Sequence, residues 1–130
     1  MLLVETEIMN SGIHGMGLFA KCDIRKGTKV WEFNPLFDIV VNEALVGELP
    51  EVARTFLKIY AYRAIETNEL TLNLDSSRHM NHSDRPNLVP DSMSTYYAAQ
   101  DIPAGTELTC DYRVFSASGT SDFQEQQGPD

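Results

Sequence analysis

The chain has 130 residues, of which 42% are hydrophobic and 22% charged. This composition is typical of one globular domain and excludes a fibrous or wholly disordered protein. Ten Lys and Arg against nineteen Asp and Glu give a formal net charge of -9, so direct binding to nucleic acid, which needs a basic surface, is not expected. The charge favours a basic partner, although acidity also keeps a protein soluble.

Targeting and membrane segments are not expected. The apolar residues 1–4 end at Glu5, which is too short for a signal peptide and lacks its basic leader. No run approaches the roughly 20 apolar residues of a membrane helix. We therefore expect a soluble intracellular protein, with a cytoplasmic location favoured and a nuclear one left open. Cys22 and Cys110 are interpreted as reduced thiols.

The pattern along the chain predicts many short strands and one helix. The predicted strands cover residues 2–8, 18–20, 30–33, 37–41, 70–74, 94–99 and 106–109. The helix is predicted over residues 50–65, because Val52, Phe56 and Ile59 or Tyr60 recur at spacings of three and four. A Pro-then-Gly turn is predicted at residues 102–105. Residues 116–130 are polar and predict a mobile acidic tail.

Residues 15–20, Gly-Met-Gly-Leu-Phe-Ala, formally match the dinucleotide fingerprint G-x-G-x-x-G/A. That fingerprint requires a preceding strand and a following helix. The next residues, 21–27, cannot continue an amphipathic helix. A tight turn that needs positive φ is therefore favoured over a nucleotide site.

Residues 78–87, Arg-His-Met-Asn-His-Ser-Asp-Arg-Pro-Asn, form a polar cluster between apolar runs. The cluster contains a literal glycosylation sequon, which means little without a secretory signal. His79, His82 and Asp84 are metal-ligand types, but no helix or strand aligns them and no further ligand is near, so no metal is predicted. A plain Asx-type turn ending at Arg85 and Pro86 remains the alternative.

A second polar cluster, Glu-Leu-Thr-Cys-Asp-Tyr at residues 107–112, follows a short predicted strand. With the glycine pair and the Asn-His-Ser turn, in this order, it resembles the SET domain of protein-lysine methyltransferases. The resemblance covers about residues 5–115. It implies a mainly β fold, the β-clip, made of several short antiparallel sheets with one or two short helices and a C-terminal pseudoknot. The implied domain spans residues 1–115, with an insert at about 42–68 and the tail at 116–130.

The resemblance implies methyl transfer from S-adenosylmethionine to a lysine in a basic protein or peptide, for example a histone. It assigns cofactor contacts to main-chain groups near the glycine pair, with Gly17 serving the turn. It adds side chains of the two polar clusters. Our own hypothesis is that Phe115, or Phe123 in the tail, stacks on the adenine as a lid. The implied cofactor-binding residues are His14, Gly15, Met16, Arg78, Asn81, His82, Tyr112 and Phe115.

Tyr112 is the implied catalytic residue. A free lysine has a pKa near 10.4 and is protonated at neutral pH, whereas methyl transfer needs a neutral amine aligned with the methyl group. A dry aromatic channel disfavours the ammonium, and the Tyr112 hydroxyl then orients the amine. The other tyrosines, Tyr60, Tyr62, Tyr96 and Tyr97, are candidate channel walls, although for each of them individually a place in the core is favoured.

The chain departs from the family at several positions. Many members have a zinc-binding Cys where this chain has Asp84, and no cysteine follows Cys110. The resemblance therefore implies a minimal, zinc-free domain. Cys110 stands where many members have Phe or Tyr, and its smaller side chain is expected to leave room for a higher methylation state or for water. Met16 and His79 also stand where aromatic residues are common.

Two other functions remain open on the sequence. One is a catalytically silent SET-like module that binds a basic peptide, and the other is a small β domain assembled for oligomerisation. The joint presence of Asn81, His82 and Tyr112 favours the enzyme. A monomer and a homodimer are both compatible with the sequence, which does not identify the substrate protein.

Overall fold

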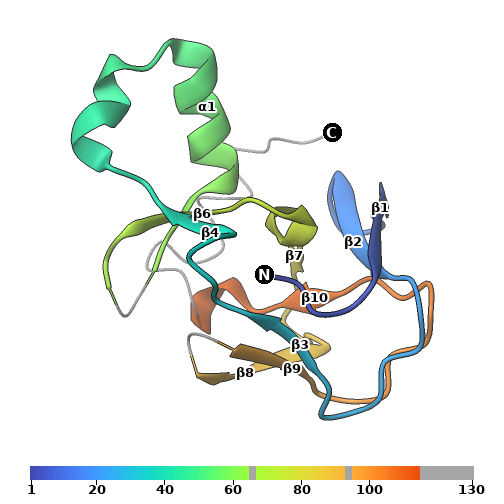
Figure 1. The fold of residues 1–130 in the computed structure, drawn as a ribbon. Coiled ribbons are helices and arrows are strands. Elements are labelled where there is room, and N and C mark those ends of the chain that lie inside the picture. The colour runs from blue at the N-terminus through green and yellow to red at the C-terminus, as the bar shows by residue number, and fades with distance from the viewer. Residues whose placement is uncertain (65–66, 93–94, 115–130) are drawn as a thin grey trace.

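The computed structural model describes residues 1–64, 67–92 and 95–114 (Figure 1). These residues form short strands, one α-helix and 3₁₀ helices. The strands are β1 (Thr6–Asn10), β2 (Met16–Ala20), β3 (Lys29–Glu32), β4 (Asp38–Val40), β5 (Tyr62–Arg63), β6 (Leu70–Asn73), β7 (Asn81–His82), β8 (Leu88–Ser92), β9 (Thr95–Ala98) and β10 (Thr109–Cys110). The helices are η1 (Glu43–Glu48), α1 (Glu51–Tyr60), η2 (Ser76–His79) and η3 (Tyr112–Val114). No helix among these residues is long and apolar enough to cross a membrane.

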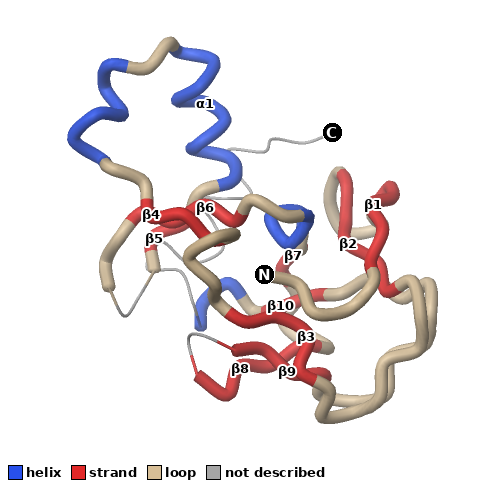
Figure 2. The backbone as a smooth tube through the Cα atoms, viewed as in Figure 1, coloured by secondary structure: helices blue, strands red, loops and turns tan. Residues whose placement is uncertain are grey.

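The strands form small separate sheets (Figure 2). β1 and β2 form an antiparallel hairpin, β3, β9 and β8 a second antiparallel sheet, and β4, β6 and β5 a third. β7 and β10 pair in parallel. The predicted mainly β fold of several small antiparallel sheets is confirmed.

The core lies where β2, β3, β8 and β9 meet the segment before β10. Its largest fully buried apolar side chains are Leu18, Val30, Leu88, Ile102 and Leu108, which come from distant parts of the sequence. Their removal from water is the main force that holds the small sheets together. Cys110 and Tyr112 belong to the same buried cluster, so the candidate site is built directly on the core.

The first strand begins later than predicted. β1 starts at Thr6 rather than at residue 2. The preceding residues run beside β3 instead, where Leu2 forms a bridge with Trp31 and the Leu3 N–H donates to the Val30 carbonyl. The Met1 amino group also pairs with Asp38 Oδ2 at 2.9 Å. These contacts with β3 separate residues 1–3 from the β1–β2 hairpin.

The helix is shorter than predicted and turns a different face inward. α1 ends at Tyr60, because Ala61 is extended and Tyr62 pairs with β6. Val52 is 77% exposed and Phe56 40% exposed, so the predicted apolar face is largely in solvent. With η1, α1 forms an arm that projects from the β4–β6–β5 sheet (Figure 1). The end of α1 packs on η2 through the rings of Tyr60 and His79, 5.4 Å apart.

The two polar clusters of the sequence lie side by side. The β7–β10 pairing sets Asn81 opposite Thr109 and His82 opposite Cys110. Asn87 reinforces it, because its amide nitrogen donates to the Glu107 carbonyl at 2.8 Å and its amide oxygen accepts from the Thr109 N–H at 2.9 Å. The predicted pseudoknot requires these two segments to meet, as they do here.

Candidate active site

A cavity of about 560 Å³ opens between the β1–β2 turn, the end of α1 and the η2–β7 segment. A volume of this size suits a small-molecule ligand. The lining residues are Asn10, Ser11, His14, Gly15, Met16, Ile59, Tyr60, Arg78, His79, Met80 and Asn81. The predicted cofactor residues His14, Gly15, Met16, Arg78 and Asn81 therefore line one cavity.

The glycine turn forms the first wall of this cavity. Gly15 has φ 47°, a left-handed conformation that favours glycine. The turn is closed by Ser11, whose N–H donates to the Gly15 carbonyl at 2.8 Å. The Ser11 hydroxyl oxygen also accepts from the Ile13 N–H at 2.9 Å and from the His14 N–H at 3.3 Å. The tight turn predicted from the glycine pair is confirmed at Gly15.

Asn81 connects this turn to the opposite wall. Its side chain is buried, and the amide nitrogen donates to Glu107 Oε2 at 2.8 Å, to the His14 carbonyl at 3.0 Å and to Ser11 Oγ at 3.1 Å. An amide nitrogen carries only two hydrogens, so these contacts are shared. Asn81 therefore fixes the shape of the cavity as well as lining it.

Arg78 gives the cavity a positive charge. Its Nη1 donates to the Leu74 carbonyl at 3.0 Å, and its guanidinium lies 5.7 Å from the Tyr60 ring centroid. Its Nε is buried and has no hydrogen-bond partner among the described residues. Burial lowers the pKa of neighbouring His79, and the charge of Arg78 lowers it further. A cationic guanidinium beside a neutral imidazole suits an anionic ligand group such as a carboxylate.

Tyr112 stands behind the wall formed by Met80. It follows β10, is buried, and its hydroxyl donates to the Met80 carbonyl. Burial raises the pKa of the Tyr112 hydroxyl well above its usual value, and Cys110 and Glu107 push it in the same direction. The phenol is therefore neutral at physiological pH and cannot serve as a general base. Tyr112 and His82 are not among the described residues that line the cavity.

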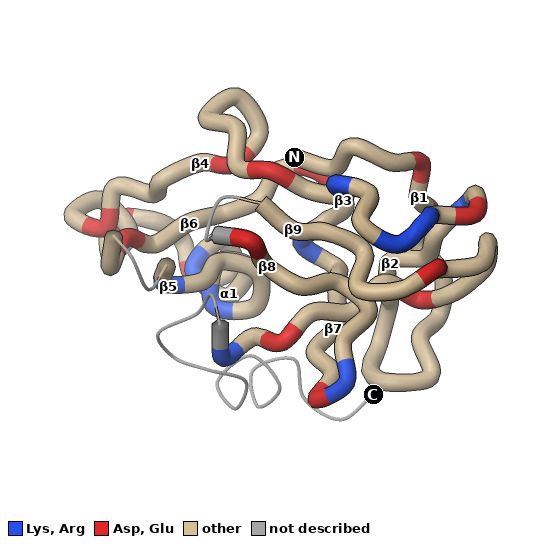
Figure 3. The backbone as a smooth tube through the Cα atoms, turned by 90° about the horizontal axis from the view of Figure 1, so that it is seen from below, with Lys and Arg blue, Asp and Glu red and all other residues tan. Residues whose placement is uncertain are grey.

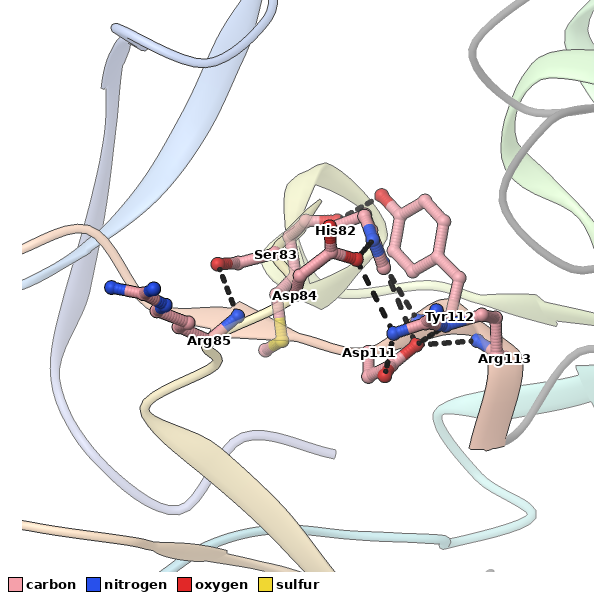
Figure 4. Close-up of polar contacts among 8 residues, drawn as sticks. His82, Ser83, Asp84, Arg85, Asp111, Tyr112 and Arg113 are labelled. Atoms are coloured by element: carbon pink, nitrogen blue, oxygen red, sulfur yellow. Dashed lines mark hydrogen bonds and ion pairs between the residues drawn. The ribbon is translucent and has the colours of Figure 1, made fainter.

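His82 lies between Tyr112 and the turn that follows β7 (Figure 4). Its Nδ1 accepts a hydrogen bond from the Tyr112 N–H at 3.1 Å, and its Nε2 lies 2.9 Å from Asp84 Oδ1. Asp84, the position of the zinc-binding Cys in many SET domains, also pairs with Arg113 at 3.2 Å. Arg113 donates to Asp111 as well, and this hydrogen bond holds the pKa of Asp111 below its usual range.

The cluster of His82, Asp84, Asp111 and Arg113 reaches from the interior, where His82 and Asp111 lie, to the surface. The side chains of Asp84 and Arg113 are 78% and 57% exposed, so their ion pair contributes little to stability. Within residues 1–64, 67–92 and 95–114, no group of three or more His, Cys, Asp or Glu residues is arranged to hold a metal ion. Here Asp84 is engaged by a histidine and an arginine.

Comparison with known proteins decides the family. Residues 15–113, which include Gly15, most of the residues that line the cavity and Tyr112, match the SET domain. The chain belongs to the SET domain family. This confirms the resemblance drawn from the three sequence motifs.

Curated relatives of this SET domain are much longer proteins. Histone-lysine N-methyltransferase 2D from Homo sapiens is 29% identical over 129 residues, a match that covers 92% of this chain and 2% of that protein. The H3 lysine-36 specific histone-lysine N-methyltransferase from Homo sapiens is 32% identical over 130 residues, covering 85% of this chain and 4% of that protein. The chain thus spans only a small part of these relatives.

Solved structures share the fold. ctPRC2 in an autoinhibited conformation bound to S-adenosylmethionine has a TM-score of 0.61 at 23% identity, covering 88% of this chain and 16% of that one. An active polycomb repressive complex 2 in the basal state has a TM-score of 0.58 at 25% identity, covering 84% of this chain and 15% of that one. These likenesses confirm the SET fold.

The other tyrosines of this SET domain divide between the cavity and the core. Tyr60 lines the cavity, and Tyr97 is half-buried in β9. Burial raises the pKa of Tyr62, Tyr96 and Cys110, and the neighbouring Cys110 raises that of both tyrosines further. The carboxylates of Asp38 and Asp111 contribute as well, to the pKa of Tyr62 and to those of Tyr96 and Cys110 respectively.

Sequence reasoning gave no site role to several residues. Asn10, Ser11, Ile59 and Met80 line the cavity, and Glu107 accepts hydrogen bonds from both Ser11 and Asn81. The one usable signal was Glu107, the charged first residue of the second polar cluster. Phe115, Phe123 and the tail at 116–130 lie outside the described residues, as does the proposed adenine lid.

Proposed function

We propose that this SET domain transfers methyl groups from S-adenosylmethionine to lysine side chains of a protein. The observation that supports this proposal is that the separate motifs of the sequence meet around one cavity. The cavity brings Arg78 and Asn81 against the glycine turn, and the carbonyl of Met80 in its wall accepts the Tyr112 hydroxyl. Membership of the SET domain family supports the same conclusion.

The residues present fit S-adenosylmethionine. The volume of the cavity suits a ligand of that size. Arg78, with its buried and unpartnered Nε among the described residues, would bind the carboxylate of the amino-acid end. The main chain of the glycine turn would contact the same end, and Asn81 would hold both walls in place. When bound, the cofactor supplies an activated methyl group.

Tyr112 would act through hydrogen bonding alone. Because burial raises its pKa, it keeps its proton and cannot remove one from lysine. Its hydrogen is directed at the Met80 carbonyl, so its oxygen can accept a hydrogen bond from the amine and orient the nitrogen lone pair. Alignment of this kind accounts for most of what an in-line methyl transfer needs.

The neutral form of the lysine would be favoured by its surroundings. A free lysine is protonated at neutral pH, and transfer into a buried site lowers its pKa. The Cys110 thiol and the Tyr96 hydroxyl are neutral, since burial raises the pKa of both, and the charge of the nearby Asp111 carboxylate raises them further.

The proposed substrate is a basic protein. A net charge of -9 favours a cationic partner, and the curated relatives named above are histone-lysine methyltransferases. A histone is therefore the first substrate to test. Acidic and basic positions alternate around the described part of the chain (Figure 3), so attraction would come from net charge rather than from one acidic face.

The test compares wild type with Tyr112→Phe. Each is incubated with methyl-labelled S-adenosylmethionine and a panel of basic proteins that includes histones, and labelled residues are located by mass spectrometry. We expect lysine labelling by wild type and a loss of about a hundredfold in rate for the variant, because amine alignment is lost. Retained binding of S-adenosylmethionine, measured by calorimetry, shows that the variant is folded. Label on arginine, or equal labelling by the variant, contradicts the mechanism.

A further inference from the structure

Glu107 receives hydrogen bonds from both walls of the cavity, although it is not a lining residue among those described. The Ser11 hydroxyl lies 2.7 Å from its Oε1 and 2.9 Å from its Oε2, and the Asn81 amide nitrogen donates to Oε2 at 2.8 Å. Ser11 precedes the glycine turn, and Asn81 begins β7. One half-buried carboxylate thus joins two segments that lie 70 residues apart.

The Ser11 hydroxyl connects Glu107 to the main chain of the glycine turn. While it donates to Glu107, its oxygen accepts from the N–H groups of Ile13 and His14. Each of these contacts depends on the orientation of the Ser11 side chain. A hydroxyl held by a carboxylate is fixed in that orientation, so Glu107 determines where the main chain of residues 13–16 lies.

The backbone of β2 closely approaches the Glu107 carboxylate. A Cβ on Gly17 would lie 2.4 Å from Glu107 Oε2 and 2.8 Å from its Cδ, far inside van der Waals contact. Gly17 lies within β2 rather than in the turn, so the expectation that it serves the turn was wrong. A side chain at position 17 would therefore displace the Glu107 carboxylate from its hydrogen bonds.

We propose that Glu107 is a positioning residue of the cofactor site, holding the glycine turn and Asn81 at the spacing that S-adenosylmethionine requires. This inference rests on the proposed function. A carboxylate suits the position because donors from Ser11 and Asn81 converge on it, and an ionised carboxylate only accepts hydrogen bonds. An amide at this position would turn one of its acceptors into a competing donor.

The experiment measures binding of S-adenosylmethionine by calorimetry and the steady-state kinetics of methyl transfer for wild type, Glu107→Gln and Glu7→Gln. Glu7 is exposed on β1, so its substitution makes the same change of charge on the neighbouring strand. We expect Glu107→Gln to raise the Kd and KM for the cofactor about tenfold, as loss of hydrogen bonds to a charged group implies. The KM for the peptide and kcat at saturating cofactor should change less than about twofold. Glu7→Gln should match wild type.

The outcomes separate this inference from the proposed function. If wild type binds no S-adenosylmethionine, the proposed function fails. If wild type binds it and Glu107→Gln binds equally well, the positioning role is overturned while the proposed function stands. A variant that loses stability and kcat without a selective change in cofactor KM also overturns it. Should Glu107→Gln not fold, Ser11→Ala must weaken cofactor binding at least about threefold, because it removes one donor to the carboxylate; an unchanged Kd overturns the role.

Discussion

The main-chain N–H of Tyr112 donates a hydrogen bond to Nδ1 of His82 at 3.1 Å. An imidazole nitrogen that accepts a hydrogen bond carries no proton, so the hydrogen of the neutral ring is on Nε2, which faces Asp84 at 2.9 Å. His82 thus links the turn after β7 to the backbone of Tyr112. This geometry suits a residue that positions the tyrosine.

Two substitutions distinguish the roles of the two ring nitrogens of His82. The amide oxygen of asparagine lies near the position of Nδ1, whereas that of glutamine reaches toward Nε2. We expect His82→Asn to keep an acceptor for the Tyr112 N–H and most of the methyl transfer. His82→Gln should lower the free energy of unfolding by about 1–3 kcal/mol, because a half-buried N–H loses its partner. Urea unfolding and rates at saturating S-adenosylmethionine measure both effects, and equal losses in the two variants would contradict the tautomer.

Local sequence signals were sufficient to predict the motifs of the site. The turn at Gly15 follows from the need for positive φ, and the polar cluster around Asn81 and His82 from residue types that a core does not select. The mainly β class followed from β-branched and aromatic runs. Each of these depends on a few adjacent residues, which is why a single sequence can indicate them.

Long-range contacts were beyond the reach of the sequence. The spacing of Gly15 and Gly17 cannot show that the second glycine faces Glu107, which is adjacent because the segment before β10 pairs with β2 through the Phe19–Glu107 bridge. The inward face of α1 was also predicted wrongly. Val52 and Phe56 have helical spacing, but the arm that carries them projects from the sheet and leaves them exposed. Periodicity locates a helix, whereas its environment determines which face is buried.

The contact between Gly17 and Glu107 predicts a coupling between two substitutions. Gly17→Ala should lower the free energy of unfolding by about 1–3 kcal/mol, because the new methyl group overlaps the carboxylate. In a Glu107→Ala background the same change should cost less, since the two closest atoms are gone and only the Ser11 Cβ remains, 3.1 Å away. Gly47→Ala is the control, because nothing lies within 4 Å of a Cβ built there. Additive losses in a double-mutant cycle measured by urea unfolding would show that the two positions are independent.

The guanidinium geometry of Arg78 predicts that charge alone is not enough for cofactor binding. Arg78→Lys keeps a positive charge but loses the planar group that faces Tyr60 and the buried Nε. We expect the Kd for S-adenosylmethionine to rise about tenfold, as arginine and lysine differ in recognising carboxylates. Arg54→Lys on the exposed face of α1 controls for the change of residue type. If Arg78→Lys binds S-adenosylmethionine as tightly as wild type, Arg78 contributes only its positive charge and the prediction is wrong.

His79 predicts a dependence of stability and cofactor binding on pH. Burial and the charge of Arg78 lower its pKa in the folded state, while the unfolded chain takes up the proton near pH 6.5. Between these two pKa values the unfolded state binds more protons, so stability is complete above about pH 6.5 and is lost as the pH falls toward the folded value. Protonation would also set a second positive charge beside Arg78 and the cofactor sulfonium, and weaken binding. Thermal unfolding and calorimetry between about pH 7.5 and 5.5 should show that wild type loses stability and cofactor affinity as the pH falls, and that His79→Asn loses less of both. If the curves of the two proteins are parallel, His79 does not cause the pH dependence.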